Sequence, residues 1–311
     1  MILEIVLIVV SIAFVLWGAN RFTDGACSLA RRLNVSELVI GLTVVALGTS
    51  LPEFMVSFMS VLRGSSDMSV GNIIGSNVFN ILVILGASAL MRPLVIEKSL
   101  LSRDLPLCLL ASLLLSGFAW TDGMIARWEG ILLVAFFCAY LYMAYRVAMK
   151  DREATPPEED VKSMSLGYSV LWVLVGMAAL VIGGRVLVDN AAAVARDWGV
   201  SESVIGMTIL AGGTSLPELA TSVMAARKGS LGLAFGNVIG SNVFNIAFVI
   251  GTCSSILPMA VTEIALMDWL MLVGSCILVW FLAWTGHVLS RLEGALITLC
   301  YVIYIVFRII N

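Results

Sequence analysis

Long apolar runs separated by short polar stretches follow one another along the whole chain. A transmembrane helix needs about 20 consecutive, mostly apolar residues, whereas a membrane β-barrel shows short segments of alternating polarity. The runs here are continuous, so the pattern predicts an all-α polytopic membrane protein. Its ten transmembrane helices are expected at 2–28, 37–61, 69–91, 101–120, 125–147, 165–193, 202–226, 233–257, 265–285 and 290–308.

The second half of the chain repeats the first at an offset of 165 residues. The motif Gly-Thr-Ser-Leu-Pro-Glu occurs at 48–53 and unchanged at 213–218, and the stretch 71–81 returns at 236–246 with one change. Each half contains five predicted spans. Because five is odd, the second half enters the membrane from the opposite side, which gives two inverted five-helix repeats. We expect the first repeat at 1–149, a cytoplasmic linker at 150–164 and the second repeat at 165–311.

Basic residues between the spans fall mainly on one side of this topology, and the positive-inside rule assigns that side to the cytoplasm. Both termini are then extracytoplasmic, and we expect a multi-pass protein of the cell inner (plasma) membrane. The residues on the basic side are Arg31, Arg32, Arg92, Lys98, Arg103, Arg146, Lys150, Arg152, Lys162, Arg227, Lys228 and Arg291.

Composition agrees with a membrane protein and narrows the chemistry. Residues are 60% hydrophobic and 13% charged, against roughly 25% charged in soluble domains. No basic cluster lies outside the short loops, so no nucleic-acid partner is expected. The six cysteines contain no Cys-x-x-Cys pair and His287 is the only histidine. A soft-metal site or a histidine-based enzyme is therefore not expected.

The Gly-Thr-Ser-Leu-Pro-Glu motif places polar groups inside an apolar run. Pro52 lacks an N–H, so the carbonyl of Gly48 loses its helical partner and the helix should break or kink. Thr49 and Ser50 stand four and three residues before Glu53, on one helical face. Such carbonyl, hydroxyl and carboxylate oxygens are hard ligands that suit Ca²⁺ or Na⁺. The second copy supplies the same groups from Thr214, Ser215 and Glu218.

A polar stripe follows in the third and eighth spans. Its residues recur at four-residue steps, as Asn72, Ser76 and Asn80 and again as Asn237, Ser241 and Asn245. We expect four of them to line an ion site: Ser76, Asn80, Ser241 and Asn245. For Asn72 and Asn237, ligation and interhelical hydrogen bonding remain equal alternatives. Asn77 and Asn242 lie on another face, where they could cap broken backbone.

The two glutamates admit a structural interpretation, in which each pairs with a buried base such as Arg21 or Arg185. Those arginines do not occupy equivalent positions, whereas the glutamates do, and an intramembrane carboxylate is by default a functional candidate. In antiparallel halves the glutamates converge near the midplane, where two carboxylates cannot both stay ionised without a counter-charge. One Ca²⁺, two Na⁺ or two H⁺ would neutralise them, which is the basis of antiport.

These paired motifs resemble the α-repeats of the calcium:cation antiporter superfamily, which includes the Na⁺/Ca²⁺ exchangers. The resemblance covers all ten predicted spans. It implies that helices two, three, seven and eight form the core and that helices one and six slide past it. It also implies a ligand set with Glu53 and Glu218 as shared Ca²⁺/Na⁺ carboxylates. The other implied ligands are Thr49, Thr214, Ser50, Ser215, Ser76, Ser241, Asn80, Asn245 and the backbone carbonyls of Ala46 and Ala211.

One position departs from this family pattern. Many Na⁺/Ca²⁺ exchangers carry Asp where this chain has Asn245, so the core has two carboxylates rather than three. The expected function is secondary Ca²⁺/Na⁺ antiport by alternating access, with no cofactor and no enzymatic activity. H⁺-coupled or K⁺-dependent Ca²⁺ exchange is the alternative, and a cation channel fits the doubled, proline-broken design less well. We expect a monomer in the lipid bilayer whose partners are Ca²⁺ and Na⁺.

Overall fold

A computed structural model describes residues 2–154, 164–199 and 211–310. The first half consists of α1 (Ile2–Leu33), α2 (Glu37–Ile40), η1 (Gly41–Val45), α3 (Ala46–Thr49), α4 (Leu51–Leu62), α5 (Ser66–Phe79), η2 (Asn80–Ile84), α6 (Leu85–Met91), β1 (Leu94–Val95), η3 (Leu100–Asp104), α7 (Leu105–Asp122), β2 (Met124–Ile125) and α8 (Arg127–Ala154). The η elements are π-helical turns that continue the neighbouring α-helices.

The second half follows the same order. Its described elements are α9 (Leu166–Asp197), α11 (Ala211–Thr214), α12 (Leu216–Lys228), α13 (Leu231–Val243), η5 (Phe244–Ile250), α14 (Gly251–Ile256), β3 (Met259–Ala260), α15 (Leu266–Gly286), β4 (Val288–Leu289) and α16 (Arg291–Ile310).

Among the described residues, eight helical segments are long and apolar enough to cross a membrane. They coincide with eight of the predicted spans, with ends displaced by a few residues. The segments Glu37–Thr49 and Leu51–Leu62, bent by 46° against each other, would add a ninth. The span predicted at 202–226 begins outside the described residues, as does most of the linker predicted at 150–164. The total of ten therefore stays a prediction.

Two short β-pairs connect the halves and reveal their relative direction. β1 pairs antiparallel with β4, and β2 pairs antiparallel with β3. β1 and β3 are equivalent at the 165-residue offset, and each follows the third span of its half, whereas β2 and β4 each follow the fourth span. Each pair therefore joins the loop after the third span of one half to the loop after the fourth span of the other. Those two loops lie on the same side of a membrane only if the halves are inverted, as the sequence predicts.

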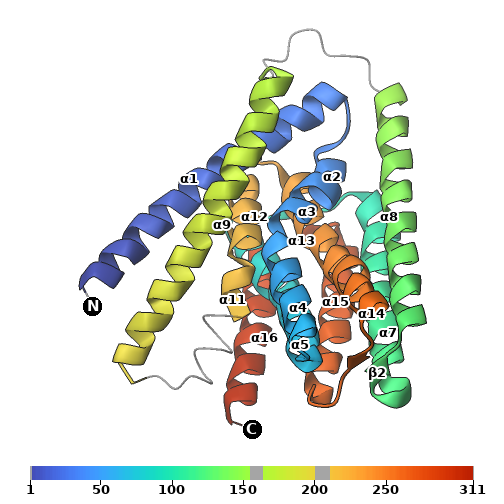
Figure 1. The fold of residues 1–311 in the computed structure, drawn as a ribbon. Helices are drawn as coiled ribbons and strands as arrows, with labels where there is room; N and C mark the ends of the chain where they lie inside the picture. The colour runs from blue at the N-terminus through green and yellow to red at the C-terminus, as the bar shows by residue number, and fades with distance from the viewer. Residues whose placement is uncertain (1, 155–163, 200–210, 311) are drawn as a thin grey trace.

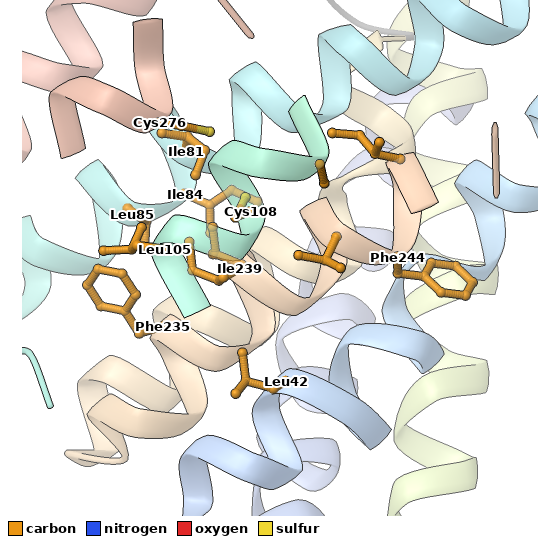
Figure 2. Packing of buried hydrophobic residues seen from close by; sticks show 14 of the residues in the cluster. Leu42, Ile81, Ile84, Leu85, Leu105, Cys108, Phe235, Ile239, Phe244 and Cys276 are labelled. Carbon is orange, nitrogen blue, oxygen red and sulfur yellow. The ribbon is translucent and has the colours of Figure 1, made fainter. Parts of the chain in front are cut away.

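The centre of the molecule is built from α4, α5, α12 and α13 with the helices that extend them. Nearly every side chain from Leu233 to Ile250 is buried. Leu42 and Leu105 of the first half belong to the same buried apolar cluster as Phe235 and Phe244 of this segment (Figure 2). A helix buried on all sides in this way leaves its polar residues no contact with lipid, so they must find partners inside the protein.

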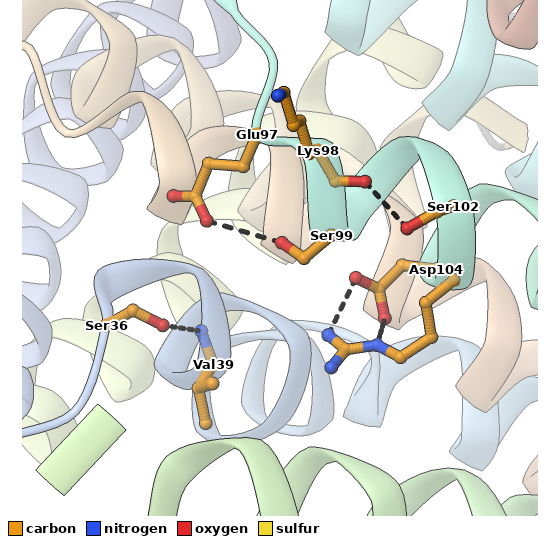
Figure 3. Close-up of polar contacts among 8 residues, drawn as sticks. Ser36, Val39, Glu97, Lys98, Ser99, Ser102 and Asp104 are labelled. Atoms are coloured by element: carbon orange, nitrogen blue, oxygen red, sulfur yellow. Dashed lines mark hydrogen bonds and ion pairs between the residues drawn. The ribbon is translucent and has the colours of Figure 1, made fainter. Parts of the chain in front are cut away.

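A serine cap fixes the start of the second predicted span. The Ser36 Oγ accepts a hydrogen bond from the Val39 N–H at 3.4 Å, so α2 begins at Glu37 (Figure 3), as is typical of a serine N-cap. Close by, the Ser102 hydroxyl donates to the Lys98 carbonyl at 2.8 Å (Figure 3).

Two long helices, α1 and α9, lie side by side across the outside of this centre (Figure 1). Their backbones approach closely at glycines: a Cβ on Gly176 would lie 2.6 Å from the Phe22 backbone nitrogen. Small residues at a helix contact are a common means of tight packing in membranes. The pair therefore forms a unit that is distinct from the core helices.

Candidate ion-binding site

Both copies of the Gly-Thr-Ser-Leu-Pro-Glu motif interrupt a helix at the serine. Ser50 has φ −86° and ψ 9° and Ser215 has φ −87° and ψ 11°, which are outside the α-helical region. Pro52 and Pro217 then lie in the first turn of α4 and α12, where a missing N–H is tolerated. The predicted helix break at Pro52 is confirmed, and the sequence equivalence extends to the backbone angles.

The break points the two glutamates inward at the start of new helices. Glu53 and Glu218 lie in the first turns of α4 and α12, where the helix dipole favours negative charge. Both side chains are fully buried, with 0% exposure. The Ser50 hydroxyl donates to Glu218 Oε1 at 2.7 Å, and the Ser215 hydroxyl donates to Glu53 Oε1 at 2.9 Å. Each carboxylate is thus held by the other half's serine, and the two are brought together.

Side-chain oxygens of the glutamates and of the polar stripes are buried without a hydrogen-bond partner in the part of the chain that the structure describes. Leaving one such atom unsatisfied costs about 1–3 kcal/mol, so several of them together indicate a site built for a ligand. The helices that carry them are in contact, α4 with η5 and α12 with η2. The atoms form equivalent pairs between the repeats: Glu53 Oε2 and Glu218 Oε2, Ser76 Oγ and Ser241 Oγ, and Asn80 Oδ1 and Asn245 Oδ1.

Two further asparagines determine which way the amides of Asn80 and Asn245 face. The Asn80 Nδ2 donates to Asn242 Oδ1 at 3.0 Å, and the Asn245 Nδ2 donates to Asn77 Oδ1 at 3.1 Å. The amides of Asn77 and Asn242 each donate to the other's backbone carbonyl at 3.1 Å. Because the NH₂ groups are engaged, the carbonyl oxygens of Asn80 and Asn245 are the atoms left for a cation.

Asn72 and Asn237, for which two interpretations were open, hydrogen-bond between helices. The Asn72 Nδ2 donates to the Ser57 Oγ at 3.0 Å, and the Asn237 Nδ2 donates to the Ser222 Oγ at 2.9 Å. These contacts favour the packing interpretation. Ser57 and Ser222 were not singled out in the sequence, although the 165-residue offset identifies them as an equivalent pair.

The remaining predicted ligands lie beside the helix break. The Thr49 hydroxyl lies 3.1 Å from Asn237 Oδ1 and 3.1 Å from the Val45 carbonyl. The carbonyl of Ala46 accepts from the Ser50 N–H at 3.1 Å. Thr214 ends the helix α11 that Ala211 begins, and the side chain of Ala211 is outside the described residues.

The structural interpretation of the glutamates, with a basic partner for each, is contradicted by the arginine contacts. The Arg21 guanidinium carbon lies 4.8 Å from the centroid of the Trp172 ring. Arg185 forms a 3.8 Å ion pair with Asp189, four residues further along its own exposed helical face. Neither arginine contacts a glutamate, so the buried negative charge is available to a cation.

Comparison with known proteins finds that this chain is similar to sodium/calcium exchangers. The family model described as "Sodium/calcium exchanger protein" matches residues 3–146 and again 168–310. The chain is 37% identical over 272 residues to the inner membrane protein YrbG of Escherichia coli, covering 85% of this chain and 83% of YrbG. It is 30% identical to the sodium/calcium exchanger MaX1 of Methanosarcina acetivorans, covering 96% of this chain and 97% of MaX1.

The fold is similar to that of a solved sodium-calcium exchanger. A structure of NCX_Mj aligns with a TM-score of 0.85 and 30% sequence identity over 98% of each chain. The similarity extends over both halves and includes the α1–α9 pair and the central helices.

Proposed function

Because this chain belongs to the sodium/calcium exchanger protein family, an antiporter family of multi-span membrane proteins, we propose that it exchanges Ca²⁺ for Na⁺ by alternating access. The ions would bind between the two repeats, in the inner membrane. The observation that supports this most directly is the reciprocal contact in which Ser50 holds Glu218 and Ser215 holds Glu53. It assembles two carboxylates, one per repeat, in a buried, oxygen-lined site.

The charge of this site explains how two cations can compete for it. Two ionised carboxylates in a low-dielectric interior repel each other strongly, and one Ca²⁺ compensates both. Two Na⁺ carry the same total charge as one Ca²⁺, but two ions rather than one must then be surrounded by oxygen ligands. Binding of one kind of cation therefore excludes the other, which is the condition for coupled exchange rather than independent leaks.

The proposed ligands keep the set expected from the sequence. Glu53 and Glu218 provide the charge, and Asn80 and Asn245 provide amide oxygens. Hydroxyl and backbone oxygens complete the shell from Thr49, Thr214, Ser50, Ser215, Ser76, Ser241, Ala46 and Ala211. Uncharged Asn in both repeats makes the site symmetric in charge, with one carboxylate from each half.

Reconstituted flux with separately imposed gradients tests the coupling ion. Proteoliposomes loaded with Na⁺ and diluted into Na⁺-free buffer are expected to accumulate radioactive Ca²⁺, and vesicles loaded with K⁺ are not. A pH gradient without Na⁺ is expected to drive no uptake. Ca²⁺ uptake driven by the pH gradient alone would contradict Na⁺ coupling and support the H⁺-coupled alternative.

We also propose that both termini face the outside of the cell, as the loop charges predict. Alkaline phosphatase fused after Asn311 is active only when exported, so the fusion is expected to be active. Green fluorescent protein becomes fluorescent only when it folds in the cytoplasm. A fusion at the same position is therefore expected to stay dark. The opposite pair of results would reverse the orientation without affecting the proposed exchange.

A further inference from the structure

The outer helices α1 and α9 form one antiparallel unit. Their contacts advance along α1 as they retreat along α9, and each is close enough that a side chain on the glycine would collide with the facing helix. These contacts join Gly18 to Ala179, Gly25 to Ser169 and Gly183 to Val15. Helices packed at such short range slide or tilt together rather than separately.

Each end of this unit carries one aspartate that the repeat makes equivalent to the other. Asp24 of α1 corresponds to Asp189 of α9 at the 165-residue offset. Because the helices are antiparallel, the two aspartates lie roughly 20 Å apart along the unit, at 1.5 Å per residue. The core offers one equivalent base at each end: Arg63 after the last residue of α4, and Lys228 as the last residue of α12.

Only one of these two equivalent pairs is formed. The Lys228 Nζ lies 2.6 Å from Asp24 Oδ1 and also donates to the Asn20 carbonyl at 2.9 Å, which ties α12 to α1. At the other end, the Asp189 side chain is 66% exposed and pairs at 3.8 Å with Arg185 of its own helix. Arg63 is exposed and has no ion pair within the described ranges.

We propose that Asp24–Lys228 and Asp189–Arg63 are alternative latches, which form in turn as the α1–α9 unit moves along the core. The inference rests on the alternating access proposed above. In an inverted repeat, the opposite state is obtained when equivalent residues exchange environments. Asp189 then reaches Arg63 while Asp24 leaves Lys228, and each latch holds the unit at one end of its travel.

The strength of such a pair suits a latch that must open in every cycle. Partly exposed ion pairs are worth little, so one latch shifts the balance between two states about two- to fivefold. A much stronger pair would trap the transporter at one end. The Asn20 contact adds a second bond to the same lysine and makes the Lys228 end the one to test first.

Crosslinking between introduced cysteines tests whether the second pair ever forms. Asp24→Cys with Lys228→Cys, and separately Arg63→Cys with Asp189→Cys, are placed in a full-length background whose native cysteines are replaced. The proteins are reconstituted and treated in Na⁺ and in Ca²⁺ with a short bifunctional methanethiosulfonate, which links the two thiols through reducible disulfides. The first pair is expected to link readily, and the second is expected to link in one of the two ion conditions. Linking either pair should arrest Ca²⁺ uptake until the link is reduced.

A charge variant tests whether loss of the Asp24–Lys228 pair favours the state in which Asp189 reaches Arg63. Lys228→Gln is expected to raise crosslinking of the Arg63→Cys, Asp189→Cys pair about two- to fivefold. The exchanged variant Asp24→Lys with Lys228→Asp should restore the original yield. Arg227→Gln is the matched control, because it removes the same charge at the adjacent exposed position and Arg227 forms no ion pair within the described ranges.

The outcomes separate the latch from the exchange function. If the unmodified protein transports Ca²⁺ but the Arg63→Cys, Asp189→Cys pair never links in any ion condition, the latch is wrong and the exchanger proposal stands. If both pairs link in turn but no Na⁺-driven Ca²⁺ uptake occurs, the latch is supported and Na⁺/Ca²⁺ exchange is wrong. Equal effects of Lys228→Gln and Arg227→Gln would also overturn the latch.

Discussion

The two repeats make matching serine–glutamate contacts at the ion site and different contacts at the ends of α1 and α9. At the site, Ser50 holds Glu218 as Ser215 holds Glu53, at 2.7 and 2.9 Å. At the periphery, Asp24 is paired with a core lysine while its equivalent, Asp189, pairs only within its own helix. Under the alternating access proposed above, we infer that symmetry is kept where both transport states would need the same ligands. It would be lost at the contacts in which the two proposed states differ.

The largest effect is expected from the glutamates, and it should be equal in the two halves. Glu53→Gln and Glu218→Gln each leave Ca²⁺ half compensated in a buried site. Loss of one buried charge partner costs about 3–5 kcal/mol, so Ca²⁺ uptake should fall at least about 100-fold. Na⁺-driven Ca²⁺ flux measures this, with the exposed Glu263→Gln as control. Wild-type flux in either variant would contradict the assignment of that glutamate as an ion ligand. It would also contradict the functional equivalence of the two halves.

The next largest effect is expected from the asparagines that orient the ligands. Asn242→Leu removes the acceptor of the Asn80 amide, and Asn77→Leu removes that of Asn245. Residues that orient metal ligands typically contribute about 10- to 100-fold in affinity. Ca²⁺ affinity measured by calorimetry should fall by that factor in both variants. Ser254→Ala, which alters a buried hydroxyl bonded only within its own helix, should leave it unchanged.

The serines that hold the glutamates should have a smaller and matched effect. Ser50→Ala and Ser215→Ala each remove one hydrogen bond to a carboxylate. At the lower end of the range for hydrogen bonds to charged groups, such a bond is worth about 1.5 kcal/mol. Ca²⁺ affinity should fall about tenfold in each. Affinities that differ widely between the two variants would show that the reciprocal contacts are not equivalent in function.

The smallest effect on rate, but the sharpest on stoichiometry, is expected at Asn245. Asn245→Asp adds a third carboxylate to the site and should require about one further monovalent charge per cycle. The dependence of Ca²⁺ uptake on Na⁺ concentration should steepen. Asn80→Asp should give the same change if the halves are equivalent at the site. Unchanged Na⁺ dependence in both would exclude these positions from the ion shell.

Much of the fold followed from local sequence. Continuous apolar runs located the long helices, because a span must bury its backbone within a contiguous apolar segment. The doubled motifs and the odd number of spans per half predicted the inversion, which the β1–β4 and β2–β3 pairs show in the structure. Pro52 predicted the helix break, which occurs at Ser50.

Other features could not be read from the chain. The direction of the Asn80 amide depends on Asn242, 162 residues away, and the Arg21–Trp172 contact that frees the glutamates from a basic partner depends on how α1 packs against α9. Such contacts between distant residues are set by packing rather than by local spacing.

The sequence by itself determined that the protein has two equivalent halves, each with one Gly-Thr-Ser-Leu-Pro-Glu motif inside an apolar run and one polar stripe. Only the tertiary structure decided that each carboxylate is held by the opposite half, and that the Asp24–Lys228 pair is formed while Asp189 is not paired with Arg63. The physical reason is that a repeated sequence assigns equal chemistry to equivalent residues. Which of two equivalent contacts is made depends on how α1 and α9 pack against the core helices, and only the tertiary structure shows that.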